Sequence, residues 1–163
     1  MTESSNSEKI VRLQDISLFN NQLTEYKFED LGNIQLFGLF VTGSWCPPCK
    51  EFENILIDFY KEVNNPEKIF EIVHMSSEKN EIEFKASITD IPWAIIKYNN
   101  NVIHHLGSEL KVEYIPMLYI ISFNGDLITD EGRKDIMDDK TTAFEKWIRL
   151  LKAHKERMDN INY

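Results

Sequence analysis

The sequence holds two cysteines, three positions apart, in the run Ser44-Trp45-Cys46-Pro47-Pro48-Cys49-Lys50. A preceding stretch rich in Leu, Phe and Val, residues 34–42, predicts a buried strand. After the pair, apolar residues at helical spacing predict a helix over residues 47–63: Phe52, Ile55, Leu56, Phe59, Tyr60 and Val63. The two prolines suit a first helical turn, which does not need their missing N–H groups. The order strand, Cys-x-x-Cys, helix therefore predicts a redox dithiol at the start of a helix.

The position at a helix N-terminus assigns a role to each cysteine. Unpaired N–H groups and the helix dipole favour the thiolate there, so Cys46 is the predicted nucleophile and Cys49 the resolving thiol. A structural zinc site would need a second ligand pair, which the four histidines do not form at ordinary spacing: His74, His104, His105 and His154. A permanent disulfide would close too short a loop to stabilise the fold strongly. The residues favour redox chemistry over both alternatives.

Composition limits the class of protein. With 163 residues, 42% hydrophobic and 28% charged, the chain suits one soluble domain with a sizeable core. The net charge of −9 argues against nucleic acid or an anionic membrane as a general partner. No apolar run is long enough for a transmembrane helix, and residues 1–8 lack a hydrophobic segment of the signal-peptide type. We therefore expect a reducing, cytoplasmic location.

The remaining patterns alternate between strand and helix. Strands are predicted over residues 69–75, 117–123 and 126–129, the last two joined by a turn at Asn124-Gly125. Helices are predicted over 80–87, 101–111 and 141–157, the last burying Phe144, Trp147, Ile148 and Leu151. Shorter patterns indicate a strand or turn in 9–18, a strand over 22–27 and a helical turn over 28–32. The acidic stretch 126–139, with Arg133 and Lys134 inside it, is interpreted as a solvated loop.

These elements predict an α/β fold of three layers, a mixed central sheet flanked by helices. We expect a single domain over residues 9–157. A disordered N-terminus is expected over residues 1–8 and a C-terminal tail over residues 158–163.

Four stretches of the chain, in order, resemble the thioredoxin superfamily. Residues 40–50 look like its active-site stretch, and the Pro-Pro insert points to the tryparedoxin and nucleoredoxin branch. Three further stretches are similar to that branch: 70–78, 91–95 and 114–118. The resemblance covers roughly residues 22 to 150. It implies a thioredoxin-like fold, a cis bond before Pro116 and protein-disulfide reductase activity through Cys46 and Cys49.

The resemblance also implies a substrate groove beside the dithiol. Its implied contact residues are Trp45, Pro47, Pro48, Trp93, Ile115 and Pro116. Glu78 occupies the place of an acidic residue in the branch and is a candidate proton acceptor near Cys49. The chain departs from the family at Phe40, where thioredoxins place a buried aspartate. It departs from the branch at Lys97, Tyr114 and Met117.

Two classes of function follow. As an enzyme, the protein would act on disulfide-bearing proteins and draw electrons from a reductase or a low-molecular-weight dithiol. It would need no cofactor or metal and would bind neither nucleic acid nor membrane. As the alternative, a redox-regulated or redox-inert adaptor would serve a larger cytoskeletal or ciliary assembly. The intact dithiol favours the enzyme, whereas the altered groove residues keep the adaptor open.

Overall fold

The computed structural model describes residues 13–98 and 101–161, and a five-stranded sheet lies at its centre. The strands stand in the order β3-β2-β1-β4-β5. Their bounds are Leu36–Thr42 for β1, Phe70–Ser76 for β2, Ala94–Ile95 for β3, Met117–Ser122 for β4 and Leu127–Thr129 for β5. Strand β1 runs parallel to β2 and antiparallel to β4, while β5 pairs antiparallel with β4. The sheet is therefore mixed, as predicted.

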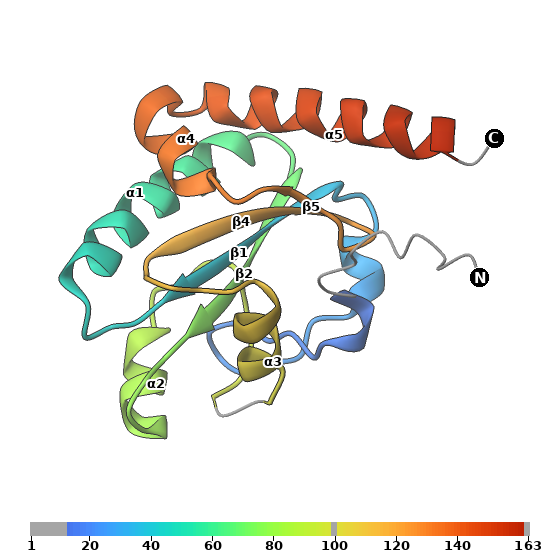
Figure 1. Cartoon of the computed structure of the whole chain (residues 1–163). Coiled ribbons are helices and arrows are strands. Elements are labelled where there is room, and N and C mark those ends of the chain that lie inside the picture. Colours follow the sequence, from blue (N-terminus) through green and yellow to red (C-terminus); the bar gives the residue numbers. More distant parts are fainter. Residues whose placement is uncertain (1–12, 99–100, 162–163) are drawn as a thin grey trace.

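Helices flank this sheet and complete three layers (Figure 1). Their bounds are Pro47–Val63 for α1, Glu81–Ser87 for α2, Asn101–Glu109 for α3, Gly132–Asp139 for α4 and Thr142–Ile161 for α5. Helices α1, α4 and α5 gather on one side, whereas α3 lies on the other with the segments that precede β1. Successive side chains of β1 point to opposite faces of the sheet. Phe40 packs in the core beneath α1 and α5, whereas Leu39 packs in the core beneath α3. This arrangement confirms the predicted fold class.

The predicted bounds hold best where the apolar pattern is longest. Helix α1 covers residues 47–63, as its periodicity indicates, because Cys46 acts as N-cap and the prolines occupy the first turn. Strand β1 starts two residues later than predicted, although Ile34 is buried. The helical turn predicted over 28–32 is a 3-10 helix, Phe28–Leu31. The strand predicted over 22–27 is wrong, because only an isolated bridge between Phe19 and Glu25 forms there.

The N-terminal predictions fall partly outside the described residues. Of residues 9–18, the structure describes 13–18, with a 3-10 turn at Leu13–Asp15. The disorder predicted for residues 1–8 lies outside the described residues.

The solvated loop predicted over residues 126–139 is wrong in its second half. Helix α4 occupies residues 132–139 and buries Asp135 and Ile136. The Asp135 carboxylate accepts hydrogen bonds from Lys146 and Trp147 of α5. Eight residues with so few inward side chains show no helical apolar period, which is why the sequence misleads here. Helix α5 also runs to Ile161, so the predicted tail begins too early.

Candidate dithiol site

The loop between β1 and α1 is a tight turn that brings Trp45 back over its own backbone. The Cys46 N–H donates to the Gly43 carbonyl at 3.2 Å. A Cβ atom on Gly43 would lie 2.8 Å from the Trp45 indole nitrogen and 3.2 Å from the Ser77 carbonyl oxygen. The indole itself donates to that carbonyl at 2.7 Å. Gly43 is thus the residue that permits the turn.

Trp45 is exposed beside Cys46, and Glu78 fixes the turn through hydrogen bonds to Ser44. The Trp45 side chain is 55% exposed, so it can meet a substrate. Glu78 accepts from the Ser44 N–H at 2.9 Å and from the Ser44 hydroxyl at 2.5 Å. Both of its carboxylate oxygens therefore serve the turn that presents Cys46, and its predicted role as proton acceptor stays a prediction.

The two thiols lie in unequal surroundings. Cys46 keeps 9% of its surface exposed at the start of α1, whereas Cys49 is completely buried one turn further on. Burial and a hydrogen bond to the Cys46 side chain raise the pKa of Cys49 to about 11, against the opposing effect of hydrogen bonds from Gly43 and Thr42. Cys46 is therefore the less buried of the two thiols, and Cys49 stays protonated at neutral pH.

The segment before β4 lies beside the dithiol loop. The Ile115–Pro116 bond is cis, as the family resemblance implied. Because Met117 pairs with Val41 near the end of β1, Ile115 and Pro116 stand next to the point where the loop begins. The Pro116 carbonyl accepts from Arg133 of α4 at 3.5 Å.

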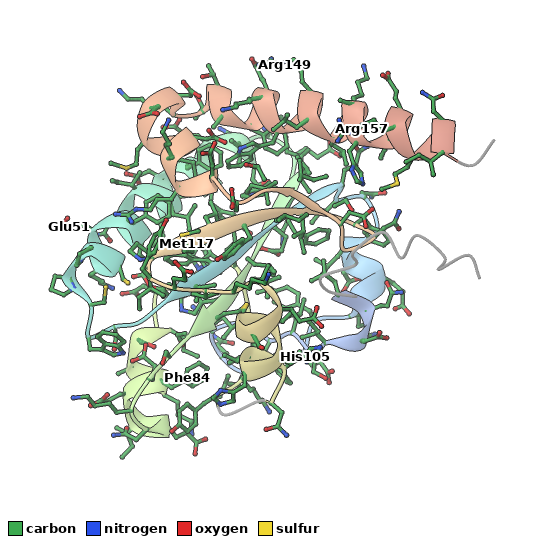
Figure 2. All side chains as sticks on the ribbon, viewed as in Figure 1. Glu51, Phe84, His105, Met117, Arg149 and Arg157 are labelled. Atoms are coloured by element: carbon green, nitrogen blue, oxygen red, sulfur yellow. The ribbon has the colours of Figure 1, made fainter. Side chains whose placement is uncertain are left out.

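Arg133 links three parts of the site, a role that its place in a charged stretch concealed. Its guanidinium carbon lies 5.9 Å from the centre of the Phe52 ring on α1 while its Nη1 reaches Pro116. It also borders a depression of about 290 Å³ beside the cis-proline. That depression is lined by side chains of mixed character, among them Tyr114, Met117, Glu131, Arg133, Lys134 and Met137. Figure 2 labels Met117, the first residue of β4.

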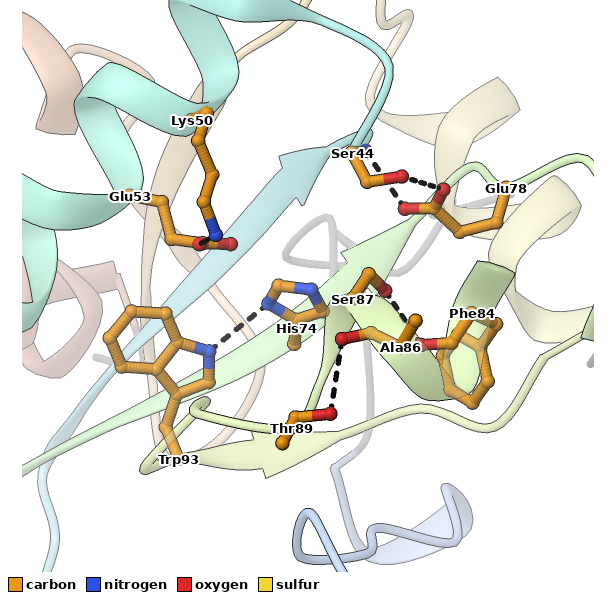
Figure 3. A network of polar contacts seen from close by, with 10 residues as sticks. All are labelled: Ser44, Lys50, Glu53, His74, Glu78, Phe84, Ala86, Ser87, Thr89 and Trp93. Atoms are coloured by element: carbon orange, nitrogen blue, oxygen red, sulfur yellow. Dashed lines mark hydrogen bonds and ion pairs between the residues drawn. The ribbon is translucent and has the colours of Figure 1, made fainter. Parts of the chain in front are cut away.

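A second hollow, here called the rear cavity, lies behind the dithiol. It measures about 190 Å³, and its lining includes Thr42, Gly43, Lys50, Glu53, His74 and Glu78. Glu53 is a buried carboxylate, and Lys50 donates to it at 2.7 Å (Figure 3). His74 accepts through Nδ1 from the Trp93 indole at 3.2 Å. Burial, reinforced by the charge of Lys50, lowers the pKa of His74 to about 3, so its ring is neutral.

Comparisons with known proteins agree with this geometry. The sequence model of the thioredoxin-like family matches residues 33–127. The chain belongs to the thioredoxin-like family. Bovine nucleoredoxin (Bos taurus) is 26% identical over 111 residues, which are 68% of this chain and 26% of nucleoredoxin. The tryparedoxin of Trypanosoma brucei brucei is 32% identical over 111 residues, 67% of this chain and 76% of that protein.

Solved structures place this thioredoxin-like chain in the same branch. The tryparedoxin structure from Trypanosoma brucei superposes with a TM-score of 0.72 at 28% identity, over 81% of this chain and 91% of that one. The predicted resemblance to tryparedoxins and nucleoredoxins is thereby confirmed. The chain spans about a quarter of the length of the bovine nucleoredoxin that it matches.

One predicted groove residue does not fit its place in this thioredoxin-like fold. Trp93 is completely buried, with its ring against Phe40 and Tyr60 and its N–H on His74. It therefore cannot form a wall that a substrate touches in this conformation. Pro47 and Pro48 are exposed on the first turn of α1, and Ile115 is half-buried beside Pro116. These three remain available to a substrate.

Glu53 and His74 are the residues that sequence reasoning missed. The buried face of α1 comprises Cys49, Phe52, Glu53, Leu56, Phe59 and Tyr60. A glutamate in this stripe, four residues after Cys49, is a signal that could have been noticed, since Ile55 was assigned to the stripe and is exposed instead. His74 gave no such signal, because only the pairing of β2 with β1 places it opposite Phe40.

The described part of the chain lacks a metal-ligand cluster and a membrane-spanning helix. Within residues 13–98 and 101–161, no three His, Cys, Asp or Glu side chains cluster in a way that could hold a metal ion. No helix in the same ranges is both long enough and apolar enough to cross a membrane.

Proposed function

We propose that this thioredoxin-like protein is a thiol–disulfide oxidoreductase that reduces protein disulfides, with Cys46 as nucleophile and Cys49 as resolving thiol. The observation that carries the proposal is the contrast between the two sulfurs. Cys46 lies at the accessible start of α1, and Cys49 is buried and hydrogen-bonded to it. This division of accessibility suits a reaction in which one thiol meets the substrate and the other acts only afterwards.

The reaction has two exchange steps. The Cys46 thiolate attacks a substrate disulfide, which forms a mixed disulfide and expels one substrate thiolate. Cys49 then loses its proton and attacks the Cys46 sulfur, so that the Cys46–Cys49 bond forms and the second substrate thiolate leaves. Substrate gains two electrons and the dithiol loses two. A reductase or a low-molecular-weight dithiol then restores the reduced protein.

The surroundings of Cys46 favour an extended protein segment as substrate. Ile115 and Pro116 precede β4, where main-chain groups can pair with a strand-like peptide. Exposed apolar side chains flank that segment, namely Trp45, Tyr114 and Met137. Met117 adds an adaptable apolar contact. We propose protein substrates in a reducing, cytoplasmic compartment, with no nucleic-acid or membrane partner, because cysteines occur only in the dithiol and the net charge is −9.

Reduction of insulin by dithiothreitol tests the function directly. We expect the protein to accelerate insulin precipitation, and Cys46→Ser to lose this effect entirely because no thiolate remains to begin the exchange. Cys49→Ser should retain the first step and accumulate a mixed disulfide, visible as a shifted band on a non-reducing gel. A wild-type protein no faster than dithiothreitol alone would reject the enzyme and favour the adaptor.

A further inference from the structure

The second exchange step requires that the buried Cys49 thiol release its proton. The thiolate, not the thiol, attacks a disulfide, and burial opposes ionisation of Cys49. Cys49 is fully buried, so bulk water does not reach its sulfur in this conformation. A group inside the protein must therefore take the proton if the step is to be fast near neutral pH.

The rear cavity borders the atoms that surround the Cys49 sulfur. Thr42 and Gly43 both hydrogen-bond to that sulfur, and both line the cavity. The cavity measures about 190 Å³ and its lining includes polar side chains such as Thr42, Ser44 and Glu78, so it has room and partners for several water molecules, each of which takes up roughly 30 Å³. A hydrogen-bonded path from Cys49 into the cavity therefore needs only water and the Thr42 hydroxyl, which must rotate to accept from the S–H group and donate onward.

Among the described residues four titratable groups face this cavity, and Glu53 suits the task best. Lys50 is a cation, and His74 is neutral with its Nδ1 already accepting from Trp93. Glu78 uses both carboxylate oxygens on Ser44. Glu53 differs, because among the described residues its carboxylate has a single side-chain partner, Lys50, which donates to Oε2.

The position of Glu53 on α1 supports the same choice. Glu53 follows Cys49 by four residues, so the two side chains project from the same face of the helix. The residue is only 7% exposed although it is a glutamate. A carboxylate buried on the inner face of an amphipathic helix is unusual unless a specific partner or task keeps it there.

We propose that Glu53 accepts the Cys49 proton through Thr42 and the water of the rear cavity during the second exchange step. The inference rests on the proposed function of the dithiol. In this step the Cys49 S–H bond breaks, its proton passes to the Glu53 carboxylate, and the resulting thiolate attacks the Cys46 sulfur. The departing substrate thiolate takes up a proton from solvent, and the protonated Glu53 returns its own to solvent when the site opens.

A chromogenic disulfide separates the two steps in a single turnover. Reduced protein mixed with dithio-bis-nitrobenzoate should release one coloured thiolate when Cys46 attacks and a second when Cys49 resolves the adduct. In Glu53→Gln we expect the first phase to be unchanged. The second phase should slow at least about tenfold at neutral pH, below the 100-fold or more that a directly contacting base contributes. It should then accelerate about tenfold per pH unit as hydroxide replaces the lost base, and approach the wild-type rate in alkali.

Two further variants separate proton transfer from mere structure. Lys50→Gln breaks the same ion pair but keeps the carboxylate, so its second phase should slow less than that of Glu53→Gln and should lack the tenfold acceleration per pH unit. Glu51→Gln removes a carboxylate at an exposed position of α1 (Figure 2) and should match wild type in both phases. A folded Glu53→Gln whose second phase is normal, or is slowed equally at every pH, overturns the proposal. So does an equal slowing in Lys50→Gln.

Failure of the proposed function can be distinguished from failure of the proposed role of Glu53. If wild type reacts in two phases with the chromogenic disulfide but does not reduce insulin, the proposed function fails while the role of Glu53 is still decided by the variants. If insulin is reduced and Glu53→Gln behaves as wild type, only the role of Glu53 fails.

Discussion

The rear cavity and the contact between α4 and α5 are built from the same residue types. Behind Cys49, a buried glutamate pairs with Lys50 at 2.7 Å, beside a histidine that binds Trp93. Under α5, the buried Asp135 accepts from Lys146 at 2.7 Å and from Trp147 at 2.9 Å. Each place therefore contains a carboxylate, a lysine and a tryptophan inside or at the edge of the core.

Asp135 and Glu53 differ in the hydrogen-bond partners of their carboxylates. Asp135 has each oxygen bonded to a different side chain, which joins α4 to α5 and leaves the group no further task. Within the described residues Glu53 has one side-chain partner, and it faces a cavity that borders the surroundings of the Cys49 thiol. Buried polar groups that serve only structure are fully paired. A carboxylate with open volume beside it can gain and lose a proton without breaking the fold.

The largest effect that we expect from this comparison is an acid sensitivity caused by His74. Its pKa is about 3 in the folded protein and about 6.5 in the unfolded chain. As the pH falls below 6.5 the unfolded chain binds the proton first, so stability is full above that pH and is lost progressively down to about pH 3. The loss is at most about 1.4 kcal/mol per pH unit.

Urea unfolding at pH values between about 7 and 5 checks this, since ordinary carboxylates stay ionised there. His74→Gln retains an acceptor for Trp93 but does not titrate, so its stability should change less over the same range. Equal pH slopes for the two proteins would show that His74 does not cause the sensitivity.

The sequence predicted the scaffold better than it predicted these polar groups. Helix α1 was predicted over its observed range because a regular apolar spacing from Phe52 to Val63 follows two prolines that suit a first turn. Helix α4 was missed because its eight residues, five of them charged, bury so few apolar side chains that no helical period emerges. Trp93 was assigned to a groove because a tryptophan beside proline suits either surface or core, and only the packing of Phe40, Tyr60 and His74 decides between them.

The candidate site, too, was predicted from the sequence only in part. The cysteines, the N-cap position and the cis-proline follow from local motifs and family resemblance. The rear cavity depends on side chains from β1, α1 and β2 that meet only in the folded protein. A sequence pattern along one element cannot show that Glu53 and His74 face the same space.

The second expected effect concerns the fully paired carboxylate. In Asp135→Asn an amide NH₂ replaces one oxygen and must face either the Lys146 ammonium or the Trp147 indole N–H, both of which are donors. We expect a loss of about 2 to 3 kcal/mol in the free energy of unfolding, the cost of buried donors left without an acceptor. Urea unfolding measures it. The two-phase reaction with the chromogenic disulfide should be unchanged, and a slowed second phase would erase the contrast with Glu53.

A third buried carboxylate tests whether full pairing is general in this core. Glu71 of β2 accepts from the Tyr60 hydroxyl at 3.1 Å and from the Ile72 N–H at 3.0 Å, and it forms an ion pair with Lys68. Tyr60→Phe removes one donor and leaves the others. We therefore expect a smaller loss, about 1.5 kcal/mol, typical of a hydrogen bond to a charged group. A loss as large as that in Asp135→Asn would indicate that the Tyr60 hydroxyl is as important to Glu71 as both donors together are to Asp135.

The smallest effect should belong to Glu53→Gln, and this contrast decides what the rear cavity is for. The substitution is isosteric, as Asp135→Asn is, but the remaining amide oxygen can still accept from Lys50, and the new NH₂ group can face the open volume of the cavity. We expect a change below about 1 kcal/mol in the free energy of unfolding, since the Lys50 side chain is largely exposed and such pairs contribute little. Parallel urea titrations of the two variants give the comparison. A Glu53→Gln protein as destabilised as Asp135→Asn would mean that Glu53 is a structural group like Asp135. A nearly unchanged stability together with a slowed second exchange phase means that burial of this carboxylate serves the chemistry of Cys49.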